Sequence, residues 1–252
     1  LLPRLMQKGQ RLVSHELHFY GIGESELEYK LHDLMAESTN PTIAPYAGTG
    51  EVKLRVTASL PEGEDAEALL QPAIKKILAA AGDYCYGIDV PDLQTAAVQA
   101  LRKKGLTVAS AESCTGGLVA ARLTEVPGAS AVFGCGIVSY NNTVKAEVLG
   151  VDPAIIEQYT AVSAETAAAM AAAIRQKSGA AIGIGITGNA GPSASEGQPV
   201  GLVFVAVASE KYSHVSRLFI DRHDADARNL IRHFAALKAL SLILRAAGYY
   251  KE

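Results

Sequence analysis

The chain has 252 residues, enough for one large domain or two ordinary ones, and 49% of them are hydrophobic while 19% are charged. This balance argues against a disordered chain, and the net charge of −3 argues against a surface built throughout for nucleic acid. No apolar run is long enough to span a bilayer, and the three cysteines (Cys85, Cys114, Cys135) show no metal-ligand spacing. We expect a cytoplasmic protein without a metal.

The first ninety residues predict a small α+β module, because strands and helices do not strictly alternate there. Its predicted elements are a strand at 11–20, a helix ending near 37, a hairpin of 41–46 and 51–59, a helix at 64–81 and a strand at 84–88. Ser25 is placed to cap the first helix.

From residue 90 the strands and helices alternate, which predicts an α/β domain of three layers with a mixed sheet covered on both faces. Helices are predicted at 93–104, 116–125, 143–149, 163–178 and 225–246, and strands at 106–112, 132–140, 180–187, 200–208 and 213–220. Ser163 is the expected N-cap of the helix at 163–178. We therefore expect two domains, residues 1–89 and residues 90–252.

The most informative segment of the sequence is AESCTGG at 111–117, which lies between a predicted strand and a predicted helix. Backbone N–H groups point outward at such a turn and stabilise negative charge. A nucleophile there would have its anion, or the oxyanion that it creates, partly solvated by fixed dipoles. The segment predicts an active-site turn, with Ser113 and Cys114 both in contention as nucleophile.

Two further polar loops follow predicted strands, at 138–145 and at 187–193, and the three loops could meet in one crevice. Lys145 is a candidate base for Ser113, because a partly desolvated lysine has a depressed pKa and Ser–Lys pairs are a known variant of the catalytic triad. A Cys114 thiol at a helix N-terminus would have a lowered pKa, although packing is the more common role of a small cysteine.

Two further patterns each allow a functional and a structural interpretation. Gly183-Ile-Gly-Ile-Thr-Gly188 matches a dinucleotide-binding pattern formally, but no helix follows it, so we reject that interpretation. Arg222 precedes a predicted helix that carries Arg228 and Arg232, and such arginines either lie on ordinary helix surface or grip a phosphate or carboxylate.

Several segments together resemble the C-terminal domain of the competence-damage-inducible CinA family. They are AESCTGG at 111–117, VPGAS at 126–130, VSYNNTVKAEVLGV at 138–151, AVSAETAAAM at 161–170 and TGNAGP at 187–192. The segments at 21–31, 39–58 and 84–88 resemble the small module that links the two larger domains of full-length members. The resemblance implies that their molybdopterin-binding-like domain is missing here, so we expect a part of a longer protein.

The resemblance implies hydrolysis of the carboxamide of nicotinamide mononucleotide to nicotinic acid mononucleotide and ammonia, without a metal or a cofactor. Ser113 would attack the amide carbon, Lys145 would accept its proton, and Tyr140 would relay or orient that proton. The N–H groups of Thr115, Gly116 and Gly117 would stabilise the oxyanion. The loop of Gly188, Asn189, Ala190 and Gly191, together with Arg222 or a neighbouring arginine, would hold the ribose phosphate.

The sequence departs from the family pattern in two places. In the third loop, Asn189 replaces a hydrophobic residue and Ser193-Ala-Ser-Glu replaces a glycine-rich run. The spacing of the family's two arginine motifs is also stretched between Arg222 and Arg232, which leaves open which arginine matches the second motif. The alternative hypothesis is a non-catalytic module that senses nucleotides or binds a protein in competence or DNA repair. A homodimer is expected from alanine-rich helix faces and family habit, and direct contact with nucleic acid or a membrane is not expected.

Overall fold

The structure is a computed structural model that describes residues 10–249 and divides into two compact units, with the boundary between Asp92 and Leu93. Residues 1–9 of the first predicted domain and 250–252 of the second lie outside the described residues. No helix within 10–249 is long and apolar enough to cross a membrane.

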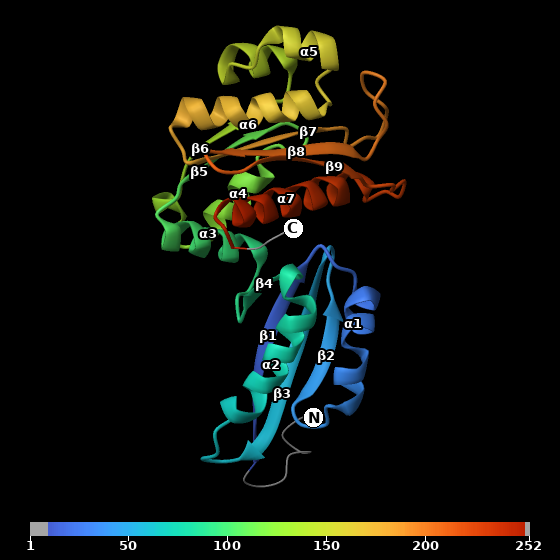
Figure 1. Cartoon of the computed structure of the whole chain (residues 1–252). Coiled ribbons are helices and arrows are strands. Elements are labelled where there is room, and N and C mark those ends of the chain that lie inside the picture. The colour runs from blue at the N-terminus through green and yellow to red at the C-terminus, as the bar shows by residue number, and fades with distance from the viewer. Residues whose placement is uncertain (1–9, 250–252) are drawn as a thin grey trace. The chain divides into compact units, whose positions relative to one another are not determined.

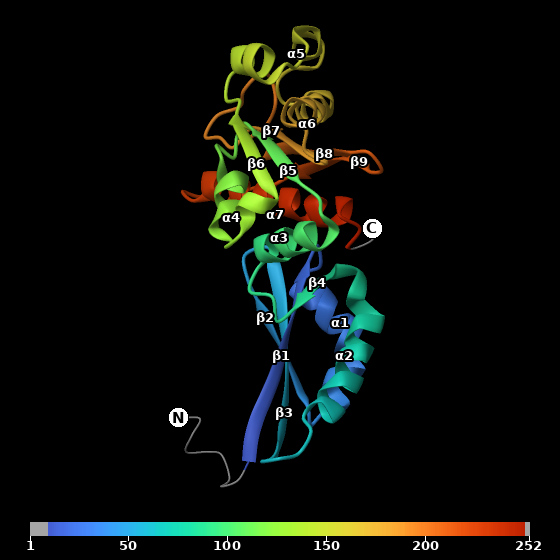
Figure 2. The same cartoon turned by 90° about the vertical axis from the view of Figure 1, so that its left-hand side faces the viewer.

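The first unit is the predicted α+β module, a four-stranded antiparallel sheet with both helices on one face (Figures 1 and 2). Its strand order, β2-β3-β1-β4, with the element order βαββαβ, gives a split βαβ arrangement. The elements are β1 (Gln10–Tyr20), α1 (Glu24–Glu37), β2 (Thr42–Ala47), β3 (Glu51–Pro61), α2 (Glu67–Ala81), the 3₁₀ turn η2 (Gly82–Tyr84) and β4 (Cys85–Ile88).

The predicted cap of α1 is wrong. The N-cap position is Gly23, which makes no side-chain bond, and Ser25 lies inside the first turn of the helix. Two acidic residues in that turn, Glu24 and Glu26, offset the positive end of the helix dipole instead.

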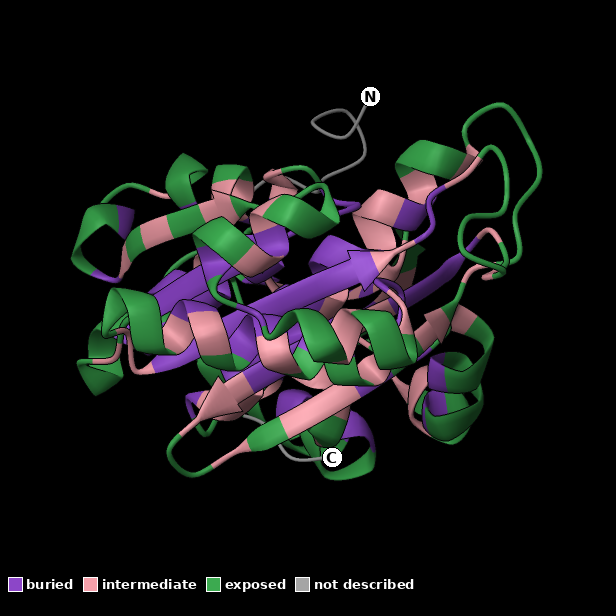
Figure 3. Ribbon diagram, turned by 90° about the horizontal axis from the view of Figure 1, so that it is seen from above, coloured by how far each residue is buried: buried purple, intermediate pink, exposed green. Residues whose placement is uncertain are grey.

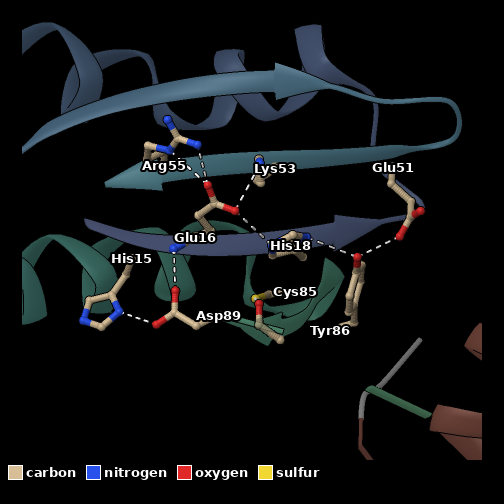
Figure 4. A network of polar contacts seen from close by, with 10 residues as sticks. His15, Glu16, His18, Glu51, Lys53, Arg55, Cys85, Tyr86 and Asp89 are labelled. Atoms are coloured by element: carbon tan, nitrogen blue, oxygen red, sulfur yellow. Dashed lines mark hydrogen bonds and ion pairs between the residues drawn. The ribbon is translucent and has the colours of Figure 1, made fainter. Parts of the chain in front are cut away.

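The two faces of the first sheet differ because side chains alternate along each strand. Leu54 and Val56 of β3 are fully buried in the core beneath the helices. The opposite face carries a polar network, shown in Figure 4. There the Glu16 carboxylate pairs with Arg55 at 2.7 Å and with Lys53 at 3.0 Å.

Four further contacts extend this network to β4 and to α2, and Figure 4 shows those of Tyr86 and the bond between His15 and Asp89. The Tyr86 hydroxyl donates to Glu51 at 2.7 Å and lies 3.3 Å from Nδ1 of His18. On the helix side, His15 bonds to Glu67 and to Asp89. The network therefore links β1, β3, β4 and α2 through side chains.

The second unit is the expected three-layer α/β domain, and its sheet has the order β6-β5-β7-β8-β9. Strand β5 pairs in parallel with β6 and β7, whereas β8 pairs antiparallel with both β7 and β9. Its strands are β5 (Val108–Glu112), β6 (Phe133–Val138), β7 (Ile182–Gly188), β8 (Leu202–Ser209) and β9 (Ser213–Phe219).

Helices cover both faces of this sheet, and Figure 3 shows its central strands buried. Figure 1 shows α5 and α6 on one side of the sheet and α3, α4 and α7 on the other. The helical elements are α3 (Leu93–Lys104), α4 (Leu118–Glu125), the 3₁₀ turn η3 (Ala129–Ala131), the π-helical η4 (Val144–Leu149), α5 (Pro153–Tyr159), α6 (Ala164–Ser178) and α7 (Ala227–Ala246).

Two helix starts in this unit compare differently with the predictions. The Ser163 cap of α6 is confirmed, since its side chain accepts a hydrogen bond from the amide of Thr166. Helix α5 was not predicted, although its start carries a good signal: Asp152 caps Ala154, and Pro153 occupies the first helical turn.

Strand β7 and helix α6 pack at unusually short range, which explains the glycine-rich pattern of the strand. A Cβ atom at Gly185 would overlap the backbone carbonyl of Ala167 and lie 2.5 Å from the amide of Ala171. A Cβ at Gly183 would overlap the Ala171 carbonyl. These glycines serve helix packing, in agreement with the rejection of a dinucleotide-binding interpretation.

Gly185→Ala should therefore destabilise the second unit by about 3 kcal/mol, since overpacking against backbone atoms forces the helix away from the sheet. Gly134→Ala is the matched control, because nothing lies within 4 Å of a Cβ built there. Denaturant unfolding of both variants measures the difference. A Gly185→Ala protein as stable as the control would contradict the packing argument.

His15 and His18 should titrate on opposite sides of the ordinary histidine value. Hydrogen bonds to Glu67 and then Asp89 raise the pKa of His15, and burial lowers the pKa of His18. Because the pKa of His15 is raised in the folded state, the contacts of the protonated ring with Glu67 and Asp89 stabilise the fold at low pH. This stabilisation is lost as the pH rises through the raised pKa. NMR titration measures both rings. Glu67→Gln should lower the pKa of His15 and leave that of His18 in place, and a joint shift would refute the assignment.

Candidate active site

The turn after β5 is built around two glycines with positive φ, Gly116 at +62° and Gly117 at +91°. Residues with a side chain rarely adopt a positive φ, so the turn needs glycine at both positions. The amide of Ser113 donates to the carbonyl of Ile186 in β7, which fixes the start of the turn against the neighbouring strand. Ser113 thus follows directly from the middle parallel strand of the sheet.

Glu112 anchors the turn from inside and was not singled out by the sequence. Its buried carboxylate accepts hydrogen bonds from the amides of Val119 and Ala120 at 3.1 and 2.9 Å, and from the Ser110 hydroxyl at 3.1 Å. A carboxylate in this position satisfies the first amides of α4 and the positive end of its dipole. Glu112 therefore ties the end of β5 to the start of α4.

Lys145 lies in η4, where a wider π-helical turn follows β6. The Asn141 side chain accepts from the amide of Val144 at 2.8 Å and stabilises the start of the turn. Gly150, with φ of +91°, ends it. π-Helical turns often occur at functional sites, because they redirect a side chain that an α-helix would place elsewhere.

Ser113 and Lys145 meet inside the protein. Lys145 Nζ lies 3.4 Å from Ser113 Oγ and donates to the carbonyl of Ser139 at 3.0 Å. The lysine is 1% exposed and the serine 8%. Burial lowers the pKa of Lys145, opposed first by the negative charge of Glu196. At a given pH a larger fraction of this lysine is therefore neutral than of an exposed lysine, and only the neutral amine can accept the serine proton.

Cys114 lies in a different electrostatic environment from the one that the sequence predicted. Its pKa is raised, to about 12, by burial, rather than lowered by the helix N-terminus. The expected lowering fails because Glu112 takes the first amides of α4 and burial penalises the thiolate. A thiol held protonated at neutral pH is a poor nucleophile.

The three polar loops line one cavity of about 480 Å³, within the range of small-molecule sites. From the predicted set, the lining includes Ser113, Tyr140, Lys145, Gly188, Asn189, Ala190 and Gly191. Arg228, one of the three candidate arginines, also lines the cavity, as do Asn142, Ala161, Thr187 and Glu196, which were not predicted as site residues. Loops that are far apart in the sequence thus meet at the carboxyl end of β5, between two parallel neighbours.

Within the third loop, the Asn189 side chain holds the loop itself together. Its Nδ2 donates to the carbonyls of Ser193 and Gln198, both at 3.1 Å, and its Oδ1 accepts from the amide of Gly191 at 2.9 Å. All of these partners belong to residues 191–198. The departure from the family pattern at this position therefore has a structural role here.

The three candidate arginines have separate positions. Arg228 lines the cavity, and its guanidinium donates to the Tyr140 hydroxyl at 3.0 Å and to the carbonyl of Gly191. Arg232 donates to the carbonyl of Thr115 at 2.9 Å and braces the turn after β5. Arg222 lies outside the lining, 3.6 Å from Asp224.

Thr115, Gly116 and Gly117 do not contribute to the cavity lining. The amide of Gly116 donates to the carbonyl of Ser113 at 3.0 Å. The hydroxyl of Thr115 is buried and has no hydrogen-bond partner within residues 10–249. Tyr140 bonds to Arg228, so its hydroxyl is engaged at the rim of the cavity.

The described residues contain no group of three or more His, Cys, Asp or Glu side chains that could hold a metal ion. The polar groups of the cavity lining are an amine, a guanidinium, amides, one carboxylate, a thiol and the hydroxyls of Ser113, Tyr140, Thr187, Ser193 and Ser195. Such a set suits acyl transfer, where an alcohol attacks and an amine moves the proton.

Family models match both units of the chain. The model of the CinA C-terminal domain matches residues 91–247, and that of the damage-inducible protein CinA KH domain matches residues 14–87. CinA-like proteins of Kosmotoga olearia and Dictyoglomus turgidum are each 41% identical, over 98% and 93% of this chain. The chain spans about half to three fifths of the length of the curated relatives that it matches.

Solved structures agree with these matches. The competence/damage inducible protein CihA of Agrobacterium tumefaciens has a TM-score of 0.58 and 34% identity, over 63% of this chain and 95% of its own. A CinA superfamily protein of Escherichia coli has a TM-score of 0.57 and 29% identity, over 62% and 89%. The chain belongs to the CinA family.

Proposed function

We propose that the second unit hydrolyses the carboxamide of nicotinamide mononucleotide, giving nicotinic acid mononucleotide and ammonia. The observation that carries the proposal is the buried contact between Ser113 and Lys145 at the wall of the cavity. The choice of substrate rests on the family resemblance in the sequence and on the charges at this cavity.

The proposed reaction uses Lys145 first as a base and then as an acid. Ser113 gives its proton to the neutral amine of Lys145 while Oγ attacks the amide carbon. The ammonium of Lys145 then protonates the departing nitrogen, which leaves as ammonia and leaves an ester on Ser113. Water attacks that ester, its proton passes to Lys145, and the carboxylate product is released as Ser113 regains its hydroxyl.

The oxyanion needs donors that face the cavity. The amide of Gly116 and the first amides of α4 are already engaged, as are the amides of Asn189 and Gly191. We assign the role to the amides of Cys114, next to the nucleophile, and of Ala190 in the third loop, since both residues line the cavity. One such donor contributes roughly 3–4 kcal/mol in a well-studied protease.

Arg228 replaces Arg222 in the proposal as the residue that binds the ribose phosphate. It alone of the three arginines lines the cavity, and its contacts with Tyr140 and Gly191 direct it across the rim. Tyr140 then has a supporting role, holding the guanidinium in place rather than relaying the proton of Ser113.

Ammonia release from nicotinamide mononucleotide tests the mechanism directly. Ser113→Ala and Lys145→Met should each lower kcat by about 10³-fold or more, because nucleophile and base act as one unit. Cys114→Ala should keep most of the activity. Full activity in Ser113→Ala would refute the serine mechanism, and nucleotide binding by a wild-type protein that releases no ammonia would support the non-catalytic alternative.

Arg228→Gln should raise KM for nicotinamide mononucleotide about 10- to 100-fold, the expected size of a lost charge-assisted contact with phosphate, with a smaller effect on kcat. Arg222→Gln is the matched control and should leave KM within about twofold of the wild type. The riboside, which lacks the phosphate, should not distinguish Arg228→Gln from the wild type. Steady-state kinetics with both substrates measures these differences, and an equal loss with the riboside would rule out phosphate binding by Arg228.

A further inference from the structure

The cavity contains one carboxylate that the proposed mechanism does not use, that of Glu196. Its Oε2 accepts from the amide of Ala161 at 2.8 Å, and its Oε1 accepts from Nδ2 of Asn142 at 3.3 Å. Glu196 lines the same cavity as Ser113 and Lys145. It lies in the segment Ser193-Ala-Ser-Glu, where the family pattern has a glycine-rich run.

The loop holds this carboxylate in a fixed position. Glu196 has a positive φ of 52°, which a non-glycine residue rarely adopts. Ser195 and Gln198 pair across it through backbone hydrogen bonds, and Asn189 bonds to the carbonyls on both sides. Glu196 is exposed to solvent, but its carboxylate is constrained by its loop and by two donors outside that loop.

Glu196 acts electrostatically on the reaction centre, because its charge raises the pKa of Lys145. The cavity thus carries a negative group in reach of Lys145 and a positive group, Arg228, at its rim. A pyridine mononucleotide carries the matching pair of charges, a cationic ring nitrogen and an anionic phosphate. Ser113 can attack only if the ring lies beside Lys145, which brings its positive charge within reach of Glu196.

We propose that Glu196 is the counter-charge of the pyridinium ring, and that it makes this site prefer cationic N-ribosylpyridinium amides to neutral amides of the same shape. This inference rests on the proposed function. A carboxylate has about four acceptor positions, so the two donors that hold Glu196 leave others directed at the ligand. Glu196 is an exposed residue, so solvent screens part of this attraction and the expected effect is that of a partly exposed ion pair.

The test compares nicotinamide mononucleotide with its 1,4-dihydro form, which has the same phosphate and nearly the same shape but a neutral ring. Dissociation constants are measured by calorimetry in a Ser113→Ala background, which prevents turnover. Glu196→Gln should weaken binding of the cationic form up to about fivefold, the size of one partly exposed ion pair, and leave the neutral form within about twofold. Glu210→Gln, in the turn between β8 and β9, is the control and should change neither.

A second measurement, the pH–rate profile of protein that retains Ser113, distinguishes an effect of the Glu196 charge from an effect on the loop structure. The groups that act on the pKa of Lys145 besides burial are Glu196 and Cys114. Glu196→Gln should therefore move the acid limb of the pH–rate profile to lower pH. Equal weakening of both ligand forms, or no weakening, overturns the inference. If the wild-type protein releases no ammonia, the proposed function is overturned, and the calorimetric comparison still decides the charge preference. If neither form of the nucleotide binds, both proposals are overturned.

Discussion

The amine of Lys145 is buried without a carboxylate in direct contact, and the rest of the site depends on that constraint. A buried ammonium is costly, which lowers the pKa of Lys145, and the amine donates hydrogen bonds to the carbonyl of Ser139 at 3.0 Å and to Ser113 Oγ at 3.4 Å. A neutral amine beside a serine hydroxyl is a base at the moment when a substrate arrives. The π-helical turn, which the Asn141 contact stabilises, places that amine 3.4 Å from Oγ of Ser113.

The nucleophile is fixed from the opposite side by a second buried charge. Glu112 binds the first amides of α4, and Arg232 from α7 binds the carbonyl of Thr115. These contacts make the turn rigid, but they also use the helix N-terminus that would otherwise stabilise an oxyanion. In the proposed reaction the oxyanion is therefore stabilised by the amides of other cavity residues, among them one in the third loop.

Local patterns were sufficient to predict most of the fold and the turn that carries Ser113. Period-two and helical patterns predicted nearly all the elements, and two adjacent glycines after a buried strand indicated the turn at Ser113. Helix α5 had a clear start signal in Asp152 and Pro153 and could have been predicted. The position of Arg228 could not, because a contact between α7 and the loops at Tyr140 and Gly191 depends on packing across the whole sheet.

The pKa of Cys114 shows the same limit in another form. Its position near a helix N-terminus predicted a lowered pKa, but burial and the charge of Glu112, which also binds the first amides of α4, raise that pKa instead. Sequence spacing shows that Cys114 lies near a helix N-terminus. It does not show that the Glu112 side chain points inward to the same amides, because a residue at a strand end can equally point to solvent.

The position of β5 explains why the site is where it is and which part of it can vary. The chain leaves β5 for β6 on one side and returns to β7 on the other, so a crevice opens at the carboxyl end of β5. Ser113 and Lys145 come from the loops after the two parallel strands β5 and β6. The third loop instead joins β7 to its antiparallel neighbour β8 and is held by its own Asn189. Its side chains can change without moving the Ser113–Lys145 pair, which makes this loop the natural place for a chain to set the charge that its ligand meets.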